Sequence, residues 1–85
     1  MVGDQEPTAA VPPDTDSLEA AARLFEEAAA ELDRASAHCR RTAEQFRGRE
    51  VPRAAAHAWV ALGHLREAER AMEAQAREHR LRANV

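Results

Sequence analysis

The stretch Phe46-Arg47-Gly48-Arg49-Glu50-Val51-Pro52, FRGREVP, determines the topology, because helix-breaking residues cluster nowhere else between residues 16 and 85. Gly48 suits the left-handed position that ends many helices. Pro52 suits the first turn of a new helix and disfavours helical geometry at Val51. The chain is therefore expected to reverse at about residues 47–51 and to form an αα-hairpin. A single kinked helix is the alternative.

Before this stretch, one set of apolar residues recurs at intervals of seven, and a set of smaller residues follows three positions later. The first set is Leu18, Phe25, Leu32, Cys39 and Phe46, and the second is Ala21, Ala28, Ala35 and Thr42. This pattern predicts a helix whose apolar seam faces another helix, with alanines that let the two backbones approach closely. Asp16 followed by Glu19 has the form of a capping box, which predicts a helix over residues 16–47.

The seven-residue interval continues after the turn at 48–51. Its members there are Val51, Ala58, Leu65 and Met72, with Ala54, Ala61 and Ala68 as companions and with Ala55, Leu62 and Ala76 beside them. Trp59 lies next to this stripe. We expect a second helix over residues 52–80 and a frayed tail over 81–85, because the pattern decays beyond Met72.

The composition limits how far such a hairpin can stabilise itself. The chain has 85 residues, of which 21 are alanine and none is isoleucine, so it forms at most one small domain with a thin core. Residues 1–15 combine prolines and acids without apolar periodicity, as a disordered acidic arm does. The predicted fold class is all-α: an antiparallel two-helix hairpin that completes a four-helix bundle with a second copy or another partner.

The charged residues argue against several classes of partner. All twelve cationic side chains are arginine, which is typical of a GC-rich bacterial coding sequence, and the net charge is −3 with a pI near 5.8. This balance favours neither nucleic-acid binding nor an anionic membrane surface. The single cysteine and the absence of a signal peptide or long apolar run favour a cytoplasmic protein.

No residue pattern predicts an enzyme or a cofactor. His38, Cys39 and His64 could meet across the seam of the hairpin and are the candidates for a metal-binding regulator, but no compact motif such as HExxH or CxxC accompanies them. The Arg and His pairs along the chain suggest no nucleophile with a base and an orienting group. The sequence therefore predicts a non-enzymatic protein without a metal or cofactor.

Two short segments resemble known families. The spacing of Ala56, Trp59, Gly63, Ala68 and Met72 is similar to that of one tetratricopeptide repeat, and this resemblance implies that the helix turns at Gly63 and adds a third segment. The alternative for Gly63 is that another helix passes it closely. Phe46-Arg47-Gly48 resembles the Trp-x-Gly bend of the WXG family of secreted helical hairpins, although the aromatic residue differs and Val51-Pro52 follows. That resemblance implies a small secretion substrate.

The sequence as a whole predicts a small protein-protein interaction module, such as an adaptor, regulator or scaffold element. Its partner is expected to be itself, as a homodimer, or another helical protein. Within the hairpin, Cys39 and Ala61 are expected to face each other. The residues expected at the interface with the partner are Leu18, Phe25, Leu32, Phe46, Trp59, Leu62, Leu65 and Met72.

Overall fold

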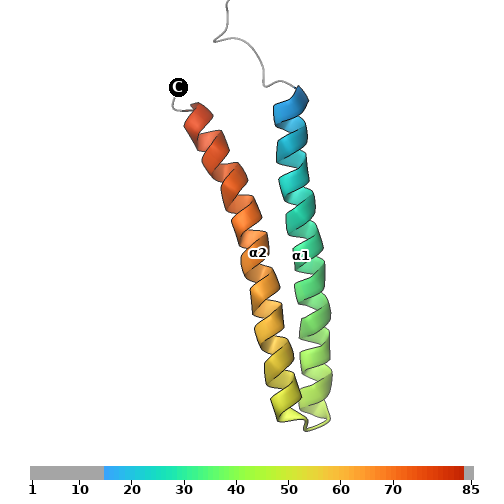
Figure 1. Cartoon of the computed structure of the whole chain (residues 1–85). Coiled ribbons are helices and arrows are strands. Elements are labelled where there is room, and N and C mark those ends of the chain that lie inside the picture. The colour runs from blue at the N-terminus through green and yellow to red at the C-terminus, as the bar shows by residue number, and fades with distance from the viewer. Residues whose placement is uncertain (1–14, 84–85) are drawn as a thin grey trace, which may run out of the picture.

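Two antiparallel helices make up the part of the chain that the structure describes, residues 15–83 of a computed structural model. Helix α1 runs over Thr15–Arg47 and helix α2 over Val51–Ala83, and α2 folds back along α1 (Figure 1). The predicted all-α hairpin is confirmed, and the single kinked helix is excluded. The predicted arm lies outside the described residues except for Thr15.

Both helices extend beyond the ranges expected from the sequence. Helix α1 begins at Thr15, so Asp16 lies in its first turn, where its carboxylate favours the positive end of the helix dipole. Asp16 therefore lies inside the helix and not at its N-cap, and Glu19 pairs with Arg23 at 3.4 Å. Helix α2 continues to Ala83, past the expected end at residue 80.

The turn between the helices is a Schellman motif. The amide of Glu50 donates to the carbonyl of Gln45 at 2.8 Å, and the amide of Arg49 donates to the carbonyl of Phe46 at 3.1 Å. Arg49 has the left-handed backbone conformation, with φ of 61°, and no glycine in the described residues has a positive φ. The expectation for Gly48 is therefore wrong by one residue.

The core between the helices consists of alanine. The buried residues are Ala28, Ala35, Ala54, Ala61, Ala68 and Ala71, and no described side chain with a larger volume is fully buried. Leu24 and Met72 pack against Ala28, Ala68 and Ala71 and are half-buried. The seam prediction is correct for the small members of the two heptad series and wrong for the large ones other than Met72, because alanines bring the backbones together and displace their larger neighbours to the flank.

Gly63 interrupts neither α2 nor its packing. The helix passes through this residue without a break, which rules out the third segment implied by the tetratricopeptide resemblance. A Cβ added at Gly63 would meet nothing within 4 Å, so no helix of the hairpin approaches it closely. Neither reason that the sequence suggested for this glycine applies within the described hairpin.

Candidate protein-interaction face

Except for Met72, the large members of both heptad series lie on one side of the alanine seam. In an antiparallel helix pair, residues that lie the same number of positions after a seam residue in each helix point to the same side of the pair. We call this side the apolar face. It comprises Leu18, Phe25, Leu32, Cys39, Phe46, Val51, Ala58, Leu62 and Leu65. Its large side chains are between 40% and 58% exposed, which is unusual for leucine and phenylalanine gathered on one surface.

An open groove of about 520 Å³ runs along the middle of the apolar face. Ala35, Thr42 and Ala61 form its floor, and Leu32, Leu62 and Leu65 stand beside them. Ser36, Cys39 and Ala58 complete the lining. The groove is almost entirely apolar, so it matches the side chains of another helix better than it matches a polar ligand.

The register of the hairpin aligns the two heptad series in pairs. Leu32 and Leu65 line the groove at one level, and Cys39 and Ala58 line it one heptad nearer the turn. Because both helices repeat every seven residues, the same register places Phe25 level with Met72 and Phe46 level with Val51. We call these four pairs rungs. Three of the four rungs carry large side chains, and only the rung of Cys39 and Ala58 is small.

The remaining predicted interface residues occupy other positions. Met72 is half-buried beneath the apolar face, against the alanine core. Trp59 is 67% exposed and lies on the outer flank of α2, three residues before Leu62. Cys39 is exposed and lines the groove together with Ala61, whereas Ala61 is buried between the helices.

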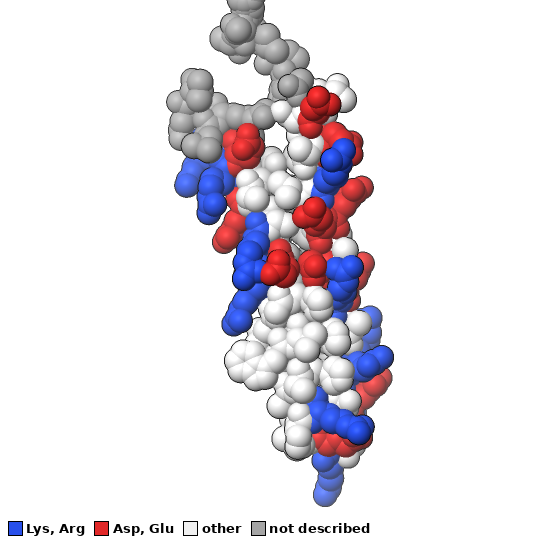
Figure 2. Space-filling view, in the orientation of Figure 1, with Lys and Arg blue, Asp and Glu red and all other residues white. Residues whose placement is uncertain are grey.

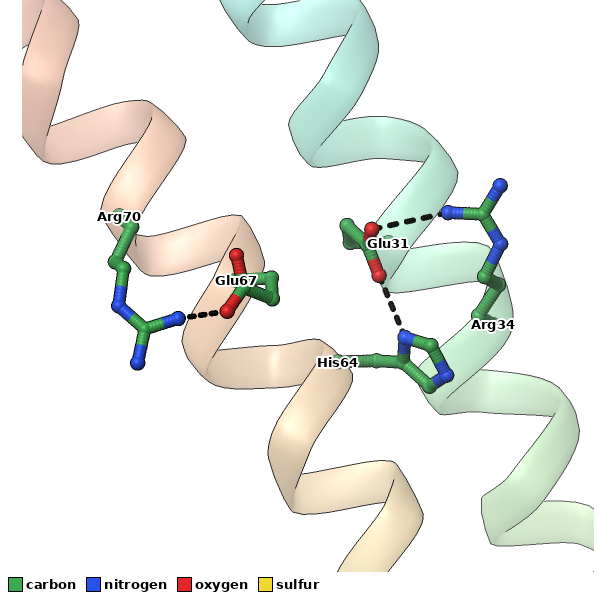
Figure 3. A network of polar contacts seen from close by, with 5 residues as sticks. All are labelled: Glu31, Arg34, His64, Glu67 and Arg70. Carbon is green, nitrogen blue, oxygen red and sulfur yellow. Dashed lines mark hydrogen bonds and ion pairs between the residues drawn. The ribbon is translucent and has the colours of Figure 1, made fainter.

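The opposite side of the seam carries polar contacts between the helices, and we call it the histidine face. Nδ1 of His38 and Nδ1 of His57 lie 3.0 Å apart, with ring planes inclined by 25°. Nδ1 of His64 lies 2.6 Å from Oε1 of Glu31, and Glu31 also accepts a hydrogen bond from Arg34 at 3.0 Å. Figure 3 shows His64 reaching from α2 to Glu31 on α1, whereas Glu67 and Arg70 pair along α2.

The contact between His38 and His57 restricts their protonation. One Nδ1 must carry the proton and the other must accept it, so the contact is lost when both nitrogens are protonated. Desolvation and the positive charges of His57, His64 and Arg41 lower the pKa of His38 below its usual 6.5. The sequence reasoning missed this pair, although residues 38 and 57 lie at matching distances from the turn.

Of the three metal candidates, the structure brings His38 and His64 together but not Cys39. His38 and His64 belong to the histidine face, with ring centroids 5.6 Å apart, whereas Cys39 lines the groove on the apolar face. Among the described residues, no group of three or more His, Cys, Asp or Glu side chains is arranged to hold a metal ion.

Charge is distributed unevenly along the hairpin. Residues 15–33 of α1 contain six carboxylates and one arginine, a net charge of −5, and residues 62–80 of α2 contain four of each sign. Residues 34–61, which form the half nearest the turn, contain six arginines and two glutamates, a net charge of +4. Figure 2 shows acidic side chains along the upper part of α1 and arginines toward the turn. Neither described helix is long and apolar enough to span a membrane.

Comparisons with known proteins find no relative of this chain. No family model matches the sequence, and no curated protein and no solved structure matches it significantly. Phe46-Arg47-Gly48 lies at the end of α1 and in the turn. Because no family model matches, the resemblance to the WXG family depends on these three residues alone.

Proposed function

We propose that this chain is a non-enzymatic protein-interaction module that associates with another helical surface through its apolar face. The observation that carries this proposal is the separation of residue sizes: alanines fill the core, while leucines and phenylalanines cover one solvent face. A monomeric hairpin has no need for large apolar residues at these positions. Their seven-residue repeat is the pattern that a packed helix partner requires.

Energetics support the same proposal. Burying six alanine methyl groups contributes about 5 kcal/mol in total, at about 0.8 kcal/mol each. The large side chains of the apolar face are roughly half exposed, so covering each one adds about 1 kcal/mol. A partner on this face would therefore contribute as much apolar burial as the whole core of the hairpin. The module would be an adaptor, regulator or scaffold element whose fold and binding are coupled.

Leu62 and Val60 provide a matched test. Both lie on α2, and their exposures are nearly equal at 40% and 41%, but they lie about 200° apart around the helix. Only Leu62 lines the groove. We expect Leu62→Asp to lower the assembled mass, measured by size-exclusion chromatography with light scattering, and to lower the melting temperature. Val60→Asp should leave the mass unchanged and shift the melting temperature by less than half as much.

In an isolated hairpin the two substitutions should have similar effects, because the Leu62 and Val60 side chains are almost equally exposed. If the wild type is a stably folded monomer at every concentration and both substitutions have equal effects, the proposed function is wrong. If Val60→Asp alone dissociates an assembly, association uses the other side of α2 instead.

A further inference from the structure

We propose that the partner on the apolar face is a second copy of this chain, packed face to face with its turn at the open end of the first hairpin. This inference rests on the proposed function and names its partner. Three properties of the hairpin point to this occupant: the area of the apolar face, the position of its one small rung, and the charge of the two halves.

The area of the face is sufficient for a stable dimer. A helix of 33 residues is about 50 Å long, and two helices packed side by side form a surface about 18 Å wide. The face therefore offers on the order of 900 Å² per hairpin, compared with about 800 Å² per partner in a standard protein interface. One copy of the hairpin is enough to cover it.

The position of the single small rung favours the antiparallel arrangement. A two-fold axis at the rung of Leu32 and Leu65 brings α1 of one copy against α1 of the other. The large rung of Phe25 and Met72 then meets the small rung of Cys39 and Ala58, and Phe46 meets Leu18. This axis allows complete overlap of the five heptad positions of α1, because Leu32 is the third of them.

A parallel arrangement packs less well. With the two turns at the same end, each rung meets its own equivalent in the other copy. The small rung of Cys39 and Ala58 would then face a second small rung and leave a void, while Phe25 and Met72 would meet another large rung. Voids and overpacking both lower stability, so the volumes of these side chains favour the antiparallel pair.

Charge favours the same orientation. Antiparallel packing lays residues 15–33 of α1, with a net charge of −5, along the half of the other hairpin nearest its turn, with a net charge of +4. Parallel packing would bring the two positive halves together and the two negative halves together. The two-fold symmetry repeats the favourable contact at both ends of the dimer.

Disulfide crosslinking tests the orientation directly. In a Cys39→Ser background, Leu32→Cys lies beside its own equivalent at the two-fold axis, so mild oxidation is expected to produce a covalent dimer. Leu18→Cys in the same background should not crosslink with itself, but should crosslink when mixed with Phe46→Cys. Light scattering under reducing conditions verifies that each variant keeps the mass of the wild-type assembly.

The outcomes show whether the orientation, the proposed function or both are wrong. Crosslinking at Leu32→Cys in a protein of dimeric mass supports both. A dimer that crosslinks instead in a mixture of Leu32→Cys with Leu65→Cys is parallel, which overturns the orientation but leaves the proposed function intact. A third result is an assembly larger than a dimer that is dissociated by Leu62→Asp and forms no Leu32→Cys crosslink. That result overturns the orientation but leaves the proposed function intact. A stably folded monomer overturns both.

Discussion

At the scale of single residues, the turn depends on Arg49 rather than on the adjacent glycine. Arg49 has φ of 61°, a conformation that costs an L-residue with a side chain roughly 1–2 kcal/mol. The carbonyls of Gln45 and Phe46 hold it there through the Schellman hydrogen bonds. The sequence locates the helix end to within one residue, but the hydrogen-bond register decides which residue takes the left-handed conformation.

Arg49→Gly is expected to stabilise the protein by about 0.5–1 kcal/mol, because glycine adopts a positive φ without strain and loses part of this gain to chain entropy. Chemical denaturation followed by circular dichroism at fixed protein concentration measures the change. Gly48→Ala is the control. Its added Cβ would make contacts of 3.5 Å and longer, so the free energy of unfolding should be unchanged or slightly higher. A loss of more than about 1 kcal/mol in Gly48→Ala would place the left-handed residue at position 48.

At the scale of the helices, the two sides of the alanine seam have different chemistry. One side exposes leucine and phenylalanine, and the other brings His38 close to His57 and His64 close to Glu31. The heptad pattern identifies both series of apolar residues. It does not state which members point inward, since a seam of leucines and a seam of alanines have the same period. The register of α1 against α2 determines which members of each series point inward.

The histidine contact predicts that the hairpin is less stable in mild acid. Because the pKa of His38 is lowered in the folded protein, the unfolded chain binds more protons just below pH 6.5. The free energy of unfolding is therefore expected to fall as the pH falls through 6.5, and this contribution levels off below the lowered pKa. The groups facing His38 are His57 and His64 on α2, with Arg41 on its own helix.

Denaturant titrations of the wild type and of His38→Gln between about pH 7.5 and pH 5.5 measure this effect. The dependence of the unfolding free energy on pH should be less steep in His38→Gln, because glutamine does not titrate. Equal slopes in the two proteins would show that the contact between His38 and His57 does not contribute to the pH dependence.

At the scale of the whole molecule, the hairpin is an electric dipole with an apolar side. Its turn half has a net charge of +4, and residues 15–33 have a net charge of −5. These charges are too widely spaced to stabilise the isolated hairpin, because pairs separated by more than about 8 Å are screened at physiological salt. Within one hairpin, opposite charges pair only locally, as in Arg23 with Glu19 and Arg34 with Glu31. The net positive half and the net negative half lie side by side when a second hairpin packs in the antiparallel orientation.

The antiparallel dimer is therefore expected to weaken when salt is added. Raising sodium chloride from about 50 mM to about 500 mM should increase the dissociation constant by roughly three- to tenfold, the range that corresponds to about 0.7–1.4 kcal/mol. Sedimentation equilibrium measures the constant directly. A parallel dimer would respond in the opposite direction, because salt would screen the repulsion between its two positive halves. Unchanged affinity would contradict a role for charge in the orientation.

The sequence by itself determined the two helices, their antiparallel return at residues 47–51 and the seven-residue spacing of the residues on the apolar face. These features depend on local backbone preferences and on helical periodicity, which can be read from a single chain. Only the tertiary structure decided that the alanines alone fill the seam while Leu32 and Leu65 face solvent, and that His38 meets His57. The physical reason is that these outcomes depend on the rotation and register of one helix against the other. A shift of one residue rotates a helix by about 100° and would exchange the buried and exposed sets without changing the sequence pattern.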